Sequence, residues 1–311
     1  MKNALKIVLA LLLLTGCAAA PASSGQPDVQ KEAVTFTDDL GRELAVEPPR
    51  RVAALIGSFA DVWILSGGRE TLAAAANDAW TSFDLELEGV ENLGLTTAPN
   101  LEVLLAVQPD LILASCNTAA DLELRETFEE AGLTAAYFDV ETIGDYLRML
   151  EICAALTGCP ERCETYGAPV LAQAEAAMAR QDGSAPKVLY VRASGSSCKV
   201  KNSQGSVLGE MLADLGCVNV ADREGVLLED LSLEAVLAAD PDYIFAVLQG
   251  ADAAKAQGVL DDALLSHPAW GNLRAVREGR FYTLDSRLYN LKPNARWGEA
   301  YEQLADILYP S

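Results

Sequence analysis

Hydrophobic and polar positions follow two alternating patterns in this chain from about residue 34 onward. Short apolar runs of strand length, bounded by Gly, Pro or Asp, are separated by stretches in which apolar residues recur every three to four positions. In the first half these patterns predict a hairpin with its turn at 39–41, strands at 51–56, 71–76, 111–114 and 134–138, and helices at 59–66, 101–107 and 121–131. Ser58 is placed to cap the helix at 59–66. Strands that alternate with helices predict an α/β fold with a mostly parallel sheet covered on both faces.

The same order of elements returns in the second half of the chain. Strands are predicted at 187–191, 243–247 and 281–284, and helices at 206–215, 233–239 and 298–308. Part of the sequence itself returns, because segment 100–113 resembles segment 231–245. Three residues are offset by 132 positions (234 − 102): Glu102, Pro109 and Asp110 match Glu234, Pro241 and Asp242. Solenoid repeats have much shorter periods, so this offset predicts two similar α/β lobes. A cleft between two lobes is a preferred site for a small ligand.

Residues 142–181, between the two halves, carry apolar residues at helical spacing. We expect a first helix that ends near residue 156, an interruption at Gly158-Cys-Pro160, and one long helix from about 160 to 181. A helix of that length spans about 30 Å and would join two lobes stiffly. The predicted organisation is an N-terminal lobe at 34–158, an inter-lobe helix at 159–183, a C-terminal lobe at 184–311, and a ligand cleft between the lobes.

The first residues predict export and lipid attachment. Lys2 and Lys6 precede an apolar run at 7–14 that is too short to span a bilayer, which indicates a signal peptide at 1–16. Leu14-Thr-Gly-Cys17 is similar to the lipobox of bacterial lipoproteins, in which the cysteine is lipidated and becomes the new N-terminus. Ordinary cleavage within 18–20 is the alternative. Residues 17–33 have the composition of a flexible tether, so we expect the folded part outside the cytoplasmic membrane, at the cell surface or in the periplasm.

The charge of the chain excludes several classes of partner. The formal net charge is −22, and loss of Lys2 and Lys6 with a signal peptide makes it −24 (−22 − 2). Such a surface repels nucleic acid and anionic lipid headgroups, although a locally positive pocket can still bind an anion. Cys153, Cys159 and Cys163 lie close in the sequence, and both one local disulfide and free thiols remain open.

His267 is the single histidine, which limits the chemistry that the chain can support. Bare Zn²⁺ or Mn²⁺ sites need several His or carboxylate ligands together, and a Ser-His-Asp or Cys-His arrangement would have to use this one residue. It precedes Pro268 in a predicted turn, a position typical of a structural role. No P-loop or convincing dinucleotide fingerprint is present. We therefore expect no enzymatic activity, no catalytic residues, no protein-held metal and no intrinsic cofactor. A hydrolase is the alternative class, although no spacing of carboxylate pairs favours a glycosidase.

Two stretches of the second half contain no acidic residue and are the candidate ligand-binding segments. Residues 187–209 hold four cations and a small-residue loop directly after a strand, where open α/β sheets place ligands. Residues 286–298 hold three cations beside two aromatic residues. Guanidinium and ammonium groups suit carboxylate, catecholate, hydroxamate or propionate oxygens, and aromatic faces suit a flat macrocycle or a catechol ring. Each cation could equally belong to a plain solvated loop. The candidates are Arg192, Ser194, Lys199, Arg287, Tyr289, Arg296 and Trp297.

Loops of the first half supply the other wall of the expected cleft. These loops hold Ser58, Phe59, Asp78, Trp80, Ser115 and Asn117, and the ligand-binding candidates among them are Phe59, Trp80 and Asn117. Trp80 is favoured because a loop tryptophan is costly to expose, and its alternative is packing under its own loop.

Several motifs, taken in order, resemble the substrate-binding lipoproteins of ABC importers for iron-siderophores, haem and cobalamin. They are Asp38-Asp-Leu-Gly-Arg42, Pro49-Arg-Arg-Val52, Pro99-Asn-Leu-Glu102, Gln108-Pro-Asp110, Gly205-Ser-Val-Leu-Gly-Glu210, Asp240-Pro-Asp242 and the segment from Trp270 to Tyr282. The resemblance covers nearly the whole mature chain and implies two α/β lobes joined by one long helix. It also implies capture of an iron complex, a ferric siderophore or haem, and its delivery to an ABC permease dimer with its ATPase. A cobalamin or corrinoid ligand is the alternative within this class, and a lipid-anchored sensor or adhesion module is the alternative outside it.

The resemblance also gives the repeated glutamates a role. In this family one exposed glutamate on each lobe docks to arginines of the permease, and Glu102 and Glu234 stand at the matching positions. Each is expected in the first turn of a helix, where a carboxylate complements the helix dipole, so a purely structural role is the alternative. We expect a monomer that binds one small-molecule metal chelate.

Overall fold

The structure, a computed structural model, describes residues 32–223, 233–250 and 252–310. Cys17, the predicted signal peptide and most of the predicted tether lie outside these residues, as does the start of the second copy of the repeat. The described part falls within one compact unit. Across the described ranges, no helix is long and apolar enough to cross a membrane.

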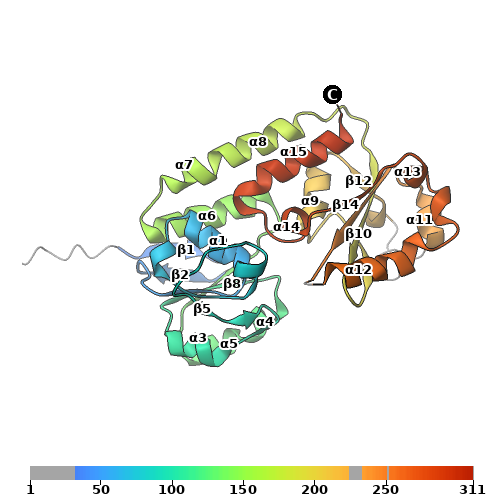
Figure 1. Cartoon of the computed structure of the whole chain (residues 1–311). Coiled ribbons are helices and arrows are strands. Elements are labelled where there is room, and N and C mark those ends of the chain that lie inside the picture. The colour runs from blue at the N-terminus through green and yellow to red at the C-terminus, as the bar shows by residue number, and fades with distance from the viewer. Residues whose placement is uncertain (1–31, 224–232, 251, 311) are drawn as a thin grey trace, which may run out of the picture. The chain divides into compact units, whose positions relative to one another are not determined.

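The first lobe is built on a parallel five-stranded sheet in the order β5-β4-β3-β8-β9 (Figure 1). Its strands are β3 (Val52–Ala54), β4 (Leu72–Ala75), β5 (Glu91–Asn92), β8 (Leu111–Ser115) and β9 (Ala135–Phe138). The inner strands are apolar and buried on both faces, as a parallel sheet covered by helices requires. Two antiparallel hairpins accompany it: β1 (Val34–Thr37) with β2 (Glu43–Val46), as predicted, and β6 (Gly94–Leu95) with β7 (Ala98–Pro99).

The helices of this lobe are α1 (Gly57–Leu65), α2 (Asp78–Thr81), α3 (Leu101–Val107), α4 (Ala119–Glu123) and α5 (Arg125–Glu130), with a 3₁₀ turn η1 (Arg69–Thr71). The helix predicted at 121–131 is therefore two short helices that meet at Leu124.

The second lobe has a mixed sheet in the order β11-β10-β13-β14, with β12 also beside β10. Its strands are β10 (Lys187–Ala193), β11 (Cys198–Lys201), β12 (Val218–Asn219), β13 (Tyr243–Leu248) and β14 (Phe281–Leu284). Only β11 runs antiparallel to its neighbour. The segment expected to be a loop after β10 is thus a hairpin, because β10 continues to Ala193 and β11 returns along it.

The helices of the second lobe are α9 (Val207–Asp214), α11 (Leu233–Ala239), α12 (Ala253–Leu260), α13 (Arg274–Arg277), α14 (Ser286–Tyr289) and α15 (Trp297–Leu308). Shorter turns are η2 (Val220–Asp222), the π-turn η3 (Asp261–Leu265), η4 (Trp270–Asn272) and η5 (Asn294–Arg296).

Three helices connect the lobes: α6 (Ile143–Thr157), α7 (Arg162–Tyr166) and α8 (Ala168–Met178). The long helix predicted from 160 to 181 is therefore interrupted, at Gly167. A side chain there could not fit, since a Cβ would stand 2.7 Å from the carbonyl oxygen of Cys163. Helix α8 lies along α15 in Figure 1. One hydrophobic core runs without a break from the first lobe through α6, α8 and α15 into the second.

The repeated Pro-Asp pairs make equivalent contacts in the two lobes. The residue before each proline ends a helix in the left-handed region, with φ of +48° and +41°. The Asp110 carboxylate then accepts the backbone N–H of Arg51 at 3.0 Å, and the Asp242 carboxylate accepts that of Lys187 at 2.8 Å. Each aspartate thus fastens the end of a helix to the start of a central strand, β3 in one lobe and β10 in the other.

Candidate ligand-binding site

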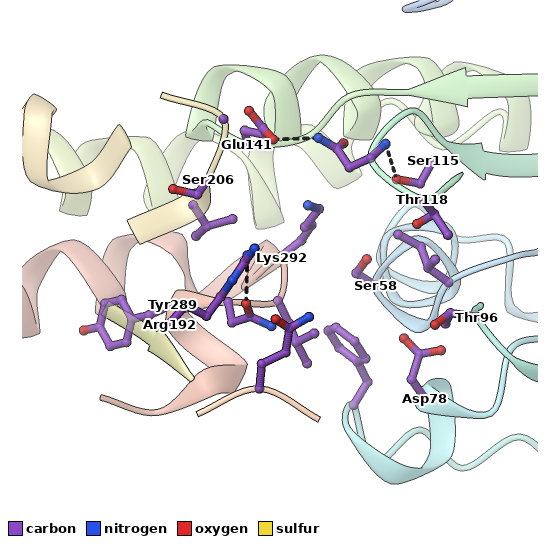
Figure 2. A pocket seen from close by; sticks show the side chains of 18 of the residues that line it. Ser58, Asp78, Thr96, Ser115, Thr118, Glu141, Arg192, Ser206, Tyr289 and Lys292 are labelled. Atoms are coloured by element: carbon purple, nitrogen blue, oxygen red, sulfur yellow. Dashed lines mark hydrogen bonds between the residues drawn. The ribbon is translucent and has the colours of Figure 1, made fainter. Parts of the chain in front are cut away.

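A cavity of about 360 Å³ lies between the two lobes and takes residues from both. The first lobe contributes the carboxyl ends of β3, β8 and β9 and the starts of α1, α2 and α4, and the second contributes β10, the start of α9, and the loops after β13 and α14. This is the edge at which open α/β sheets bind ligands. Most lining side chains are hydroxyl, amide or charged groups (Figure 2).

The wall from the first lobe presents hydroxyls and a carboxylate. Ser58 lies within the first turn of α1, not ahead of it as a cap, because the helix already begins at Gly57. The Asp78 carboxylate accepts the N–H of Gly57 at 2.9 Å, and burial raises the pKa of Asp78. Behind the wall, the fully buried Asp121 accepts the N–H of Ser115 at 2.8 Å, and desolvation raises the pKa of Asp121 to about 7.

The wall from the second lobe is cationic. In the β10–β11 hairpin Arg192 pairs across the strands with Lys199, and Tyr190 pairs with Lys201. Residues directly opposite each other on paired strands point to the same face, and so do residues two positions apart along one strand. The side chains of Tyr190, Arg192, Lys199 and Lys201 therefore all lie on one face of the hairpin. Arg192 lines the cavity, as does Lys292 from the loop after α14, whereas Lys199 and Lys201 lie next to the lining and not in it. We call Arg192, Lys199, Lys201 and Lys292 the cationic cluster.

One carboxylate, that of Glu141, lies at the junction of this cluster with the first lobe. Glu141 follows β9, and its Oε1 accepts the Nδ2–H of Asn117 at 2.6 Å. Burial raises the pKa of Glu141, and the nearby charge of Lys292 opposes that rise. Burial likewise lowers the pKa of Lys292, and Glu141 is the largest opposing influence. The two groups therefore stabilise each other's charge inside the cavity.

Two contacts cross from one lobe to the other beside the cavity. Arg287 in α14 pairs with Asp84 after α2, with Nη1–Oδ2 and Nη2–Oδ1 distances of 2.5 and 3.3 Å, and both side chains are solvent-exposed. The fully buried Asn294 donates from Nδ2 to the Ser58 carbonyl and to the Asp61 carboxylate, each at 2.8 Å. The exposed pair is weak by its nature, so the buried amide is the stronger link between the lobes.

Three of the ten ligand-binding residues predicted from the sequence line the cavity: Asn117, Arg192 and Tyr289. The Tyr289 hydroxyl donates to the carbonyl of Ala300 at 3.0 Å, so this residue offers its ring to the cavity and not its hydroxyl. Arg192 makes one long hydrogen bond, from Nη1 to Asn290 Oδ1 at 3.4 Å.

The other predicted residues lie elsewhere. Phe59 and Trp297 are at most 1% exposed and belong to the core, because an apolar ring at a helical position facing inward packs there. Trp80 is half-buried against the same core. Its neighbours in the sequence, Asp78 of α2 and Phe83 after that helix, line the cavity. Arg296 pairs with Glu299 one helical turn away. The remaining three are Ser194 in the β10–β11 turn, Lys199 beside Arg192, and Arg287 in the exposed pair.

Sequence reasoning missed most of the other lining residues, among them Glu141, Tyr190 and Lys292. Glu141 directly follows a predicted strand, the same signal that pointed to Asn117, but its carboxylate is unexpected in a pocket for an anionic ligand. Tyr190 looked like an ordinary apolar strand residue. Its hydroxyl is buried without a hydrogen-bond partner among the described residues.

Glu102 and Glu234 are both exposed in the first turn of their helices, α3 and α11. Neither side chain makes a hydrogen bond or ion pair within the described part of the chain that would give the residue a structural role. His267 accepts the N–H of Ala269 through Nδ1 in an exposed turn, away from the cavity. No group of three potential metal-ligating side chains occurs in residues 32–223, 233–250 and 252–310.

Two α/β lobes joined by packed helices, with a polar cavity between them, define a two-lobed solute-binding protein. The chain belongs to the periplasmic binding protein family, whose sequence profile matches residues 52–288. The family expected from the motifs and the two-lobed fold expected from the repeat are therefore both confirmed.

Known relatives cover most of the chain. It is 26% identical over 294 residues to the Fe(3+)-citrate-binding protein YfmC of Bacillus subtilis, covering 90% of this chain and 87% of that one. It is 25% identical over 221 residues to a vitamin B12-binding protein of Salmonella choleraesuis, covering 68% and 77%. The structure shares its fold with the apo form of the periplasmic heme-binding protein RhuT from Roseiflexus sp. RS-1, with a TM-score of 0.67, 23% identity, and coverage of 84% and 98%.

Proposed function

We propose that this protein is an extracytoplasmic solute-binding lipoprotein that captures an iron complex, a ferric siderophore or haem, and delivers it to an ABC permease with its ATPase. The observation that carries the proposal is the cavity between the lobes, whose second-lobe wall is cationic. Such a site binds a compact anionic ligand by charge-assisted hydrogen bonds and needs no reacting group. The protein performs no chemistry, and a modest movement of the lobes traps and releases the ligand.

Two features outside the cavity support the same role. Glu102 and Glu234 form an exposed carboxylate on each lobe, available to arginines of a permease dimer. Cys17, in its lipobox-like context, would hold the protein at the membrane by a lipid, and the tether at 17–33 would let the monomer reach the permease.

Cobalamin is the second candidate ligand, favoured by the similarity to vitamin B12-binding proteins. A corrinoid carries amide side chains, for which the hydroxyl and amide groups of the first-lobe wall are suitable partners.

Uptake by living cells tests this proposal. We would delete the gene in its own host and measure uptake of ⁵⁵Fe from ferric siderophores and haem and of ⁵⁷Co-labelled cobalamin. The proposal predicts loss of uptake of one of these compounds and recovery by the wild-type gene but not by a Cys17→Ala gene. Unchanged uptake of every compound would overturn it and favour a sensor or adhesion role.

A further inference from the structure

We propose that the ligand is a carboxylate-bearing ferric chelate, and that its carboxylates bind Arg192 and Lys292 on the second-lobe wall while Glu141 limits the negative charge that the cavity accepts. This inference rests on the proposed function and narrows its ligand. It is carried by the arrangement of charges in the cavity.

The like charges of the cationic cluster repel one another. Arg192 stands directly across the hairpin from Lys199 and diagonally from Lys201, and like charges at such positions destabilise a pair of strands. No carboxylate of the described residues lies within 4.0 Å of any of the cluster's four cations. The neighbouring charge of Arg192 contributes to lowering the pKa of both Lys201 and Lys292, after burial in each case. An anion that entered the cavity would relieve this repulsion.

The cavity offers carboxylates directional donors as well as charge. Among the described residues the Arg192 guanidinium makes one hydrogen bond, of 3.4 Å to Asn290, so its planar edge can bind a carboxylate through two hydrogen bonds. Tyr190 stands two residues earlier on the same face, and its buried hydroxyl has no partner within the described part of the chain. Burial raises the pKa of Tyr190 to about 12, so the hydroxyl keeps its proton and can donate a hydrogen bond to an anion.

The same lining is poorly suited to haem. A flat macrocycle needs broad apolar and aromatic faces. Trp80 and Trp297 pack outside the cavity, and the aromatic residues of the described lining are Phe83, Tyr190 and Tyr289. Haem iron also needs an axial ligand. The described lining contains no His, Met or Cys, and the raised pKa of Tyr190 opposes the phenolate form that binds iron.

Glu141 limits how much negative charge a ligand can carry into the cavity. Its carboxylate accepts a hydrogen bond from Asn117 at 2.6 Å, and its charge favours the charged form of Lys292, so it offsets part of the cluster's charge. A ligand carboxylate that binds Lys292 must approach Glu141, which repels it. Glu141→Gln keeps the oxygen that accepts from Asn117 and removes only the charge.

Affinities of charge variants test this inference. We would measure binding of ferric citrate, ferric rhizoferrin, ferric enterobactin, ferrioxamine B, haem and cyanocobalamin to the unlipidated mature chain by calorimetry. For the carboxylate chelate that binds, Arg192→Gln and Lys292→Met should each weaken affinity by about 10- to 100-fold, the value of a lost charged hydrogen bond. Lys187→Gln is the matched control. It removes a charge from the exposed start of the same strand and should change affinity by less than about twofold.

Glu141→Gln should instead tighten binding of the carboxylate chelate by about 3- to 10-fold, through loss of a repulsion of roughly 1 kcal/mol. A misfolded variant cannot produce this gain. If only a catecholate, a hydroxamate or haem binds, or if the Arg192 and Lys292 variants bind like the Lys187 control, the inference is overturned and the proposed function stands. If only cyanocobalamin binds, the inference and the iron ligand are both overturned, and cobalamin takes their place. If no compound binds, both are overturned.

Discussion

Replacement of Asn294 is expected to loosen the connection between the two lobes. Its Nδ2 joins the start of η5 to α1 of the first lobe through the carbonyl of Ser58 and the carboxylate of Asp61. Asn294 is fully buried and has φ of +52°, a left-handed conformation that asparagine tolerates better than most residues. One side chain thus combines a conformational and a hydrogen-bonding role.

The magnitude follows from these contacts. Asn294→Ala removes a hydrogen bond to a neutral carbonyl, worth about 1 kcal/mol, and one to a carboxylate, worth about 2 kcal/mol. Alanine also adds about 1 kcal/mol of strain in the left-handed region. The Oδ1 of Asn294 is buried without a partner, and its removal returns about 1 kcal/mol. We therefore expect a loss of about 3 kcal/mol for Asn294→Ala and of about 2 kcal/mol for Asn294→Gly, which has no such strain.

Urea unfolding of the unlipidated mature chain measures this loss. We expect a single transition, because the core is continuous through both lobes. If Asn294→Ala lowers the free energy of unfolding by less than about 1 kcal/mol, the buried amide is not the link between the lobes. If Asn294→Gly loses as much as Asn294→Ala, the left-handed conformation contributes nothing.

Three further predictions concern buried charge, exposed charge and docking. Burial raises the pKa of Asp121 to about 7 from an ordinary value near 4, so between these pH values the folded state holds a proton that the unfolded chain releases, and stability falls as pH rises. Asp121→Asn should therefore be more stable than wild type at pH 8 by roughly 2–4 kcal/mol, but not at pH 4. Identical pH profiles of urea unfolding for the two proteins would contradict this. Arg287→Gln should change the free energy of unfolding by less than about 0.5 kcal/mol, because its pair with Asp84 is solvent-exposed, and a loss above about 2 kcal/mol would make that pair a structural lock. Glu102→Ala and Glu234→Ala should lower cellular uptake and leave the affinity for the chelate unchanged. The control is Glu126→Ala, which replaces an exposed glutamate of the first lobe and should change neither uptake nor affinity. Normal uptake by the Glu102→Ala, Glu234→Ala double variant would exclude docking through these residues.

The two-lobed fold was predictable because local and repeated signals agreed. Helix α3 and strand β14 have the predicted bounds, and the offset of 132 residues (242 − 110) correctly marked equivalent Pro-Asp pairs. Breaks inside helices were not predictable. The interruption at Gly167 depends on a close approach to the Cys163 carbonyl, which no pattern of apolar residues reveals.

The site was only partly predictable, because residue type does not decide which way a side chain points. Arg192 and Trp297 both occur in acid-free stretches, but the alternation along β10 turns Arg192 into the cavity and the helical position of Trp297 turns it into the core. The hairpin register that sets Arg192 opposite Lys199 required the strand β11, which the small residues at 194–197 concealed.

The most direct test of the central claim is a calorimetric titration of the unlipidated mature chain with ferric carboxylate chelates and the matching iron-free chelators. We predict saturable one-to-one binding of a ferric chelate with a micromolar or lower dissociation constant, and much weaker binding of the same chelator without iron. If neither these complexes nor haem, the other ferric siderophores or cyanocobalamin bind, the cavity between the lobes is not a chelate-binding site.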